Sequence, residues 1–194
     1  MKRYKSVFKK NLLLMSVLVL VILFGIFLIK NFPSTNNKQF PSLGGSFQLT
    51  DQNGRPFYSR NLDKKKIIYF GYTYCPDVCP FDILKLSKYI DQNPSVKNEL
   101  EFIFITVDPE RDKIMQVKEF LENFNPAIHG LTGTVREVNQ VIRQFRIYVK
   151  KNQTSSEDNY LIDHSSLFFL LDSKDNYITH FSPNDLKLKL EDFI

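Results

Sequence analysis

The feature that most constrains this chain is an uncharged apolar run near its N-terminus. Residues 12–29 read LLLMSVLVLVILFGIFLI and contain no charged side chain. At about 1.5 Å per residue in a helix, a run of this length nearly crosses a hydrocarbon core of about 30 Å. We therefore expect residues 12–29 to form a single transmembrane anchor that holds the rest of the chain at membrane lipid.

A cleaved signal peptide is the alternative interpretation of the apolar run. Its apolar region would span about 7 to 15 residues and end at a cleavage site with small residues. Residues 30–40 read KNFPSTNNKQF and offer no such site. A mitochondrial presequence would be rich in Arg, whereas one Arg precedes the run. We therefore expect an uncleaved anchor in a bacterial cytoplasmic (inner) membrane.

The positive charge of the chain is concentrated beside this anchor. The formal net charge is +5, from 26 basic and 21 acidic residues, but residues 1–30 hold six of the basic residues and none of the acidic ones. The remainder therefore has 20 basic and 21 acidic residues, near neutrality, so we expect no nucleic-acid partner. Five positive charges precede the anchor and one follows it, which predicts cytoplasmic residues 1–11 and a periplasmic C-terminal domain.

The part beyond the anchor has the pattern of one α/β domain. Polar residues 30–42, with two prolines, predict a linker, and residues 43–194 are enough for a full core. Strands buried on both faces are predicted by apolar runs at residues 67–70, 102–107 and 167–171. Helices are predicted by apolar spacing at residues 114–124, 135–145 and 186–193, the last capped by Asn184 or Asp185. Alternating strands and helices predict a central sheet flanked by helices.

Two hairpins are predicted at the ends of this domain. Residues 47–50 and 56–58 flank Asn53-Gly54, a pair that suits the positive φ angles of a two-residue turn. Residues 167–181 form the second expected hairpin, which turns at residues 173–176. Both hairpins would extend or complete the central sheet.

The two cysteines of the chain, Cys75 and Cys79, follow the first buried strand within GYTYCPDVCP. We expect them at the start of a helix, where the helix dipole and free N–H groups lower a thiol pKa. A spacing of four residues places both sulfurs on one helical face. A purely structural disulfide is disfavoured because so short a loop stabilises little. The pair therefore predicts redox exchange or metal capture.

An imidazole is the natural third ligand for two thiolates. His164 lies in YLIDHSS directly before the last buried strand, where we expect a loop facing the end of the first strand; His129 and His180 have no comparable placement. Two Cys and one His suit Cu(I), and Cu(II) if an oxygen ligand joins, whereas structural zinc usually takes a fourth protein ligand. Carboxylates that would orient the imidazole or serve as turn and capping residues are Asp77, Asp108 and Asp163.

Four ordered motifs resemble the Sco (SenC) family of membrane-anchored, thioredoxin-like copper proteins. They are FGYTYCPDVCP at 70–80, TVDPERD at 106–112, GLTG at 130–133 and Asp163-His164. The resemblance implies a thioredoxin-like fold with an N-terminal hairpin extension. It also implies that Cys75, Cys79 and His164 bind copper, as Cu(I), Cu(II) or both. Ordinary thioredoxin-like reductases instead carry Cys-x-x-Cys and a facing proline, which YLIDHSS lacks.

The resemblance implies a role at the dinuclear copper centre in subunit II of cytochrome c oxidase. The leading hypothesis is a metallochaperone, not an enzyme, that delivers copper to that subunit. The alternative is a thiol-disulfide oxidoreductase that reduces the cysteines of the target with Cys75 and Cys79 as its redox-active pair. A copper or redox sensor is a third reading, and a peroxiredoxin-type peroxidase ranks last because there is no distant resolving cysteine. Further partners to expect are other copper chaperones and thiol reductases.

Overall fold

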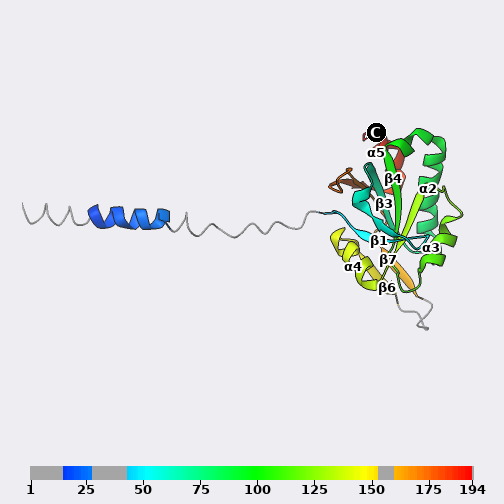
Figure 1. The fold of residues 1–194 in the computed structure, drawn as a ribbon, viewed down its shortest axis with the longest axis horizontal. Coiled ribbons are helices and arrows are strands. Elements are labelled where there is room, and N and C mark those ends of the chain that lie inside the picture. The colour runs from blue at the N-terminus through cyan, green and yellow to red at the C-terminus, as the bar shows by residue number, and fades with distance from the viewer. Residues whose placement is uncertain (1–14, 28–42, 153–159, 194) are drawn as a thin grey trace, which may run out of the picture. The chain divides into compact units, whose positions relative to one another are not determined.

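The computed structural model describes residues 15–27, 43–152 and 160–193 (Figure 1). The chain divides into two compact units, Met1–Phe40 and Pro41–Ile194. Residues 15–27 of the first unit are helical, and their side chains are mostly exposed. Among the described residues, no helix combines the length and apolarity needed to cross a membrane. The predicted anchor at 12–29 runs past the described residues at both ends, and the N-terminal segment 1–11 and the linker 30–42 lie outside them, so these assignments stay predictions.

A seven-stranded mixed sheet forms the centre of the second unit, in the order β2-β1-β5-β4-β3-β8-β9. Strand β3 pairs parallel with β4 and antiparallel with β8, and the central strand β4 pairs parallel with β5. The three predicted buried strands are confirmed as β3, β4 and β8, whose residues are almost all buried. The strands are β1 (Gln48–Asp51), β2 (Pro56–Tyr58), β3 (Lys65–Gly71), β4 (Leu100–Thr106), β5 (Ile128–Thr132), β8 (Phe168–Leu171) and β9 (Tyr177–Phe181).

Helices cover both faces of this sheet, with α2 and α3 on one side and α4 on the other (Figure 1). Successive side chains of a strand point to opposite faces, so Tyr69 of β3 bonds to Asp82 of α2, whereas Phe70 packs against Phe145 at the end of α4. The helices are α2 (Val78–Gln92), α3 (Ile114–Leu121), α4 (Val135–Gln144) and α5 (Leu186–Glu191). The three predicted helical segments are therefore confirmed.

The capping prediction for the last helix is confirmed in position, at Asp185, but not in the side-chain hydrogen bond. A 3-10 turn, Pro183–Asp185, precedes α5, and the Ser182 hydroxyl accepts the N–H of Asn184. Asp185 occupies the N-cap position of α5 without a capping hydrogen bond from its side chain. The proline restricts the chain to this turn before the helix begins, which moves the capping side chain upstream.

Both predicted hairpins exist, but the first has a wider turn than expected. β1 and β2 pair with Thr50 opposite Pro56, so five residues connect the paired positions instead of two. The Asp51 carboxylate accepts the N–H groups of Asn53 and Arg55, and Gly54 alone in this loop adopts a positive φ, +78°. An aspartate that bonds to its own following backbone stabilises a longer turn than Asn-Gly alone predicts. The β8–β9 hairpin turns where predicted.

A separate two-stranded ribbon carries His164. Strands β6 (Val149–Asn152) and β7 (Leu161–His164) pair antiparallel, with Val149 opposite His164, and they do not join the seven-stranded sheet. The predicted loop around His164 is therefore wrong for residues 161–164, which are a strand. β7 has only four residues, and an alternation of exposed and buried side chains over so short a stretch cannot be recognised in the sequence.

Strand β5 also escaped prediction, because His129 and Gly130 interrupt its apolar pattern. Gly130 is required by the approach of α3, since a Cβ there would lie 2.4 Å from Leu121 Cδ1 and 2.5 Å from Val117 Cγ1. The glycine thus lets α3 pack directly on the sheet.

Candidate metal centre

The two cysteines lie where the connection from β3 enters α2. Cys75 sits in the turn before the helix, where its N–H donates to the Tyr72 carbonyl, and Cys79 is the second residue of α2. The expectation that both sulfurs share one helical face is therefore wrong for Cys75, which precedes the helix. The turn brings them together instead, because the Cys79 N–H, in the first turn of α2, donates to Cys75 Sγ over 3.5 Å.

His164, the last residue of β7, faces this pair. Its Nε2 lies 3.1 Å from Cys79 Sγ, and its Nδ1 lies 3.0 Å from the carbonyl oxygen of Ser165. A carbonyl can only accept, so we assign the ring hydrogen to Nδ1, which leaves the Nε2 lone pair directed at the thiols. The ring stands edge-on to Tyr69 and Tyr72, with centroid distances of 6.3 and 5.9 Å.

Three donor atoms thus converge. One ligand atom from each of Cys75, Cys79 and His164 lies within 4.8 Å of the others. Two thiols and one imidazole form a soft, three-donor set, which suits Cu(I) better than a hard cation. The other histidines lie elsewhere: His129 of β5 bonds to Glu101, and His180 of β9 bonds to Tyr177.

The two thiols differ in protonation. A hydrogen bond from Cys79, helped by N–H groups of the turn, lowers the pKa of Cys75 to about 3 against the opposing effect of its burial. The same hydrogen bond and complete burial raise the pKa of Cys79. Both cysteines are free, so at neutral pH the pair holds a half-buried thiolate and a buried thiol. Such a pair is suited both to attack on a disulfide and to capture of a soft metal ion.

Gly71, the last residue of β3, makes room for the buried sulfur. A Cβ at this position would lie 2.9 Å from Phe104 Cε2, 2.9 Å from Tyr69 Cε1 and 3.3 Å from Cys79 Sγ. The glycine therefore lets the Cys79 sulfur pack against the end of the strand, next to the tyrosine that borders the imidazole.

Comparison with known proteins gives the family of the chain. The profile of the SCO1/SenC family matches residues 35–192. The chain belongs to the SCO1/SenC family. It is 41% identical to "Protein sco1" of Schizosaccharomyces pombe, over 74% of this chain and 56% of that protein. It is 36% identical to "SCO2-like protein" of Rickettsia felis, over 78% of this chain and 75% of that protein.

A solved structure agrees with this membership. ScoI of Bradyrhizobium japonicum, solved with copper bound, superposes with a TM-score of 0.71 at 36% identity, over 79% of this chain and all of that one. The described α/β domain has the thioredoxin-like fold of Sco proteins, as the sequence motifs predicted.

The three carboxylates that were predicted to support the metal site of this Sco domain have different environments. Asp77 and Asp163 are exposed, and Asp77 makes no capping hydrogen bond although it precedes α2. Asp108 is buried and accepts from Arg111 Nε at 2.5 Å and from the Tyr160 hydroxyl at 2.7 Å. The imidazole Nδ1 meets the Ser165 carbonyl, so a contribution of these carboxylates to metal binding stays a prediction.

Sequence reasoning missed a buried polar cluster beneath the imidazole. Asp82 of α2 accepts hydrogen bonds from the Tyr69 hydroxyl at 3.0 Å and from Ser166 at 2.5 Å, and pairs with Lys85 at 3.1 Å. Burial, with the nearby Cys79 and Asp82, raises the pKa of Tyr69 and keeps its phenol neutral. The cluster ties β3 and α2 to the segment that follows His164. The sequence shows only that an aspartate lies within the helix after the cysteines. It does not show that the side chain of Asp82 is buried.

Proposed function

We propose that this SCO1/SenC protein binds one copper ion through Cys75, Cys79 and His164 and helps assemble the dinuclear copper centre of cytochrome c oxidase subunit II. The observation that carries the proposal is the group of three soft donors within 4.8 Å, in a chain 36% identical to a ScoI solved with copper bound. The family motifs support the role in oxidase assembly. Copper is then the cargo of the protein and not a permanent cofactor.

The geometry supports a site that loads and unloads by ligand exchange. Cys75 is half-buried and supplies the accessible thiolate, whereas the Cys79 sulfur is buried and the imidazole is held by its neighbours. A buried thiol must lose its proton to act as a thiolate ligand, so loading releases the proton of Cys79. An incoming thiolate of the target would then displace the accessible Cys75 first.

Titration with Cu(I) under reducing conditions tests the ligand set. The full-length protein should bind one copper per chain, and His164→Ala should weaken binding by at least about tenfold, the cost of losing even an outer-shell partner of a metal site. His180→Ala is the matched control, because this exposed histidine lies on β9 and should leave the affinity unchanged. Equal affinity of wild type and His164→Ala would contradict the proposal.

A second function is favoured by the protonation of the pair. The Cys75 thiolate would attack a disulfide of the target to give a mixed disulfide, and Cys79 would then resolve it, leaving a reduced target and a Cys75–Cys79 disulfide. A thiol reductase would have to restore the dithiol. His164→Ala in cells separates the two functions: oxidase assembly should fail if copper delivery is essential, and survive if only dithiol exchange matters.

The location proposed for this chemistry is the periplasmic side of a bacterial cytoplasmic membrane, with residues 12–29 as the anchor. The charge asymmetry around the apolar run supports it. Protease added to intact spheroplasts should digest the domain at residues 43–194. Protection of that domain until the membrane is disrupted would contradict this orientation.

A further inference from the structure

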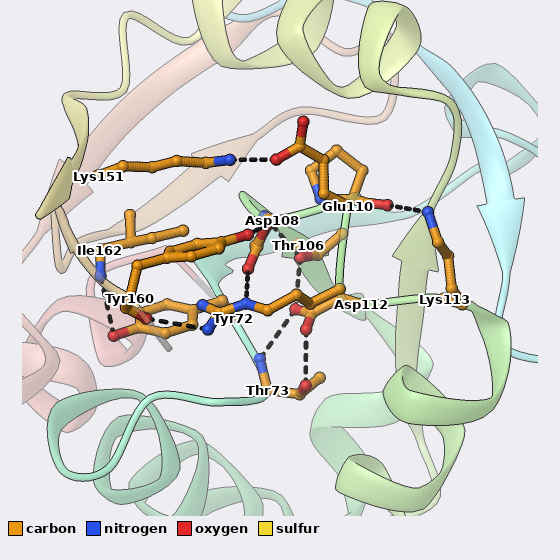
Figure 2. Close-up of polar contacts among 12 residues, drawn as sticks. Tyr72, Thr73, Thr106, Asp108, Glu110, Asp112, Lys113, Lys151, Tyr160 and Ile162 are labelled. Atoms are coloured by element: carbon orange, nitrogen blue, oxygen red, sulfur yellow. Dashed lines mark hydrogen bonds and ion pairs between the residues drawn. The ribbon is translucent and has the colours of Figure 1, made fainter. Parts of the chain in front are cut away.

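The turn between β4 and α3 touches both segments that supply the proposed ligands (Figure 2). On one side, the buried Asp112 carboxylate accepts from the N–H and hydroxyl of Thr73, at 2.8 and 2.6 Å, and from Thr106 at 2.6 Å. Thr73 lies two residues before Cys75. Asp112 therefore anchors the cysteine-bearing loop to the end of β4.

On its other side, the same turn holds the ribbon that ends in His164. Arg111 Nη1 donates to the Tyr160 carbonyl at 2.9 Å, and the guanidinium carbon lies 3.5 Å from the centroid of the Tyr160 ring. The Tyr160 hydroxyl donates to Asp108 at 2.7 Å, and Lys151 of β6 pairs with Glu110 (Figure 2). Tyr160 directly precedes β7, four residues before the imidazole.

Arg111 contacts both the cysteine-bearing loop and the ribbon. Its guanidinium lies 5.9 Å from the ring of Tyr72 and 4.9 Å from that of Tyr74, the residue before Cys75. Tyr72 in turn accepts the Ile162 N–H of β7 through its hydroxyl, at 3.2 Å. A planar guanidinium stacks on aromatic rings and bonds through its fork at the same time, which an ammonium cannot do.

These contacts matter because the ribbon is outside the main sheet. Backbone pairing in the seven-stranded sheet fixes the strand that leads to the cysteines, whereas β6 and β7 pair only with each other among the described strands. After His164 the chain joins the main sheet only at Phe168, so the distance between imidazole and thiols also depends on side-chain contacts such as those of Arg111. Its Nε bond to the buried Asp108 fixes the guanidinium in turn.

We propose that Arg111 is a positioning residue of the metal centre, which clamps the ribbon through Tyr160 to the cysteine-bearing loop and so keeps His164 within reach of both thiols. It acts through His164 and does not touch the metal. The test by copper affinity rests on the proposed function. The position of the imidazole can be measured in the metal-free protein and does not depend on it.

A double-mutant cycle on Cu(I) affinity tests this coupling. Arg111→Lys keeps the charge and removes the fork and the stacking, and it should weaken copper binding about 10- to 100-fold, as loss of an outer-shell partner does. In a His164→Ala background the same change should have almost no further effect. Arg136→Lys, an exposed arginine on α4, is the control and should bind as wild type. Full additivity of Arg111→Lys and His164→Ala would overturn the proposal.

The metal-free protein gives an independent readout. In the wild type the imidazole lies edge-on to Tyr69 and Tyr72, so ring currents should shift its NMR signals away from those of a solvated histidine. Arg111→Lys should move these signals toward solvated values. Tyr160→Phe keeps the aromatic ring and the backbone carbonyl but removes the hydrogen bond to Asp108, so it should shift the imidazole signals by less. If Arg111→Lys fails to fold, the Tyr160→Phe variant provides the test. Unchanged imidazole signals in the folded variants would overturn the proposal.

The outcomes separate this proposal from the proposed function. If His164→Ala binds copper as wild type does, the ligand set is wrong, and only the imidazole signals decide the role of Arg111. If His164→Ala weakens binding while Arg111→Lys does not, the ligand set stands and the clamp is refuted.

Discussion

Gly71→Ala should damage both the stability of the fold and the metal centre. The new methyl group would lie 2.9 Å from ring carbons of Phe104 and Tyr69 and 3.3 Å from Cys79 Sγ, so at least one of these groups must move. Overpacking of this kind costs about 1 to 3 kcal/mol of unfolding free energy. Because Tyr69 borders His164 and Cys79 is a proposed ligand, copper affinity should fall as well, by about tenfold if the displacement costs 1.4 kcal/mol at the site.

Gly130→Ala is the matched control for this substitution. Its methyl group would meet Leu121 and Val117 of α3 at 2.4 and 2.5 Å, away from the cysteines, so stability should fall at least as much while copper affinity stays unchanged. Urea denaturation of the metal-free protein measures the first quantity, and competition with a Cu(I) chelator measures the second. Wild-type stability and affinity in Gly71→Ala would refute the reasoning, as would an equal loss of affinity in both variants.

Three further predictions concern other parts of the domain. Thr134→Ala removes the capping box of α4 and should lower the free energy of unfolding by about 0.5 to 2 kcal/mol. Hydrogen bonds from Thr134 lower the pKa of Glu137 below 4.5, so the stabilisation by Glu137 is present at neutral pH and should be lost as the pH falls through that lowered pKa. Acid unfolding of wild type and Glu137→Gln checks this loss. Lys66→Met should cost about 3 to 5 kcal/mol in denaturant unfolding because it leaves the fully buried Asp175 unpaired, and Lys66→Met/Asp175→Asn should recover part of that loss; no loss in the single variant would contradict the pairing. Cys75, with a pKa of about 3, should react with iodoacetamide at a rate that is constant between about pH 5 and 8, whereas a rate that rises steeply through pH 8 would show an ordinary thiol.

The sequence predicted the parts of the fold that depend on continuous apolar patterns. The runs that became β3, β4 and β8 contain no charged residue and only one polar residue, Thr106, and burial on both faces gives that pattern directly. β5 was not predicted because Gly130 interrupts its apolar pattern. This glycine allows α3 to pack against the sheet, and such a tertiary contact leaves no periodic pattern in the sequence. The four-residue strands of the ribbon are too short to show a period.

The three donor residues were named from the sequence, but the way they meet was not. Helical spacing predicted adjacent sulfurs for the wrong reason, since Cys75 precedes α2 and the turn supplies the approach. The support of His164 by Arg111 and Tyr160 joins residues 49 positions apart. Contacts between segments so distant in the chain leave no local pattern, so the structure was needed to find them.

Transfer of metal to the target is the most direct test of the proposed function. The full-length protein, loaded with one Cu(I), is mixed with the metal-free, reduced copper domain of cytochrome c oxidase subunit II, and copper is measured on each protein after separation. A metallochaperone should leave copper on the target, and His164→Ala should transfer less of it than His180→Ala. If copper stays on the donor in this mixture, and the metal-free protein reduces the cysteines of the oxidised target in a parallel one, the protein is a thiol-disulfide oxidoreductase and the account of copper delivery is contradicted.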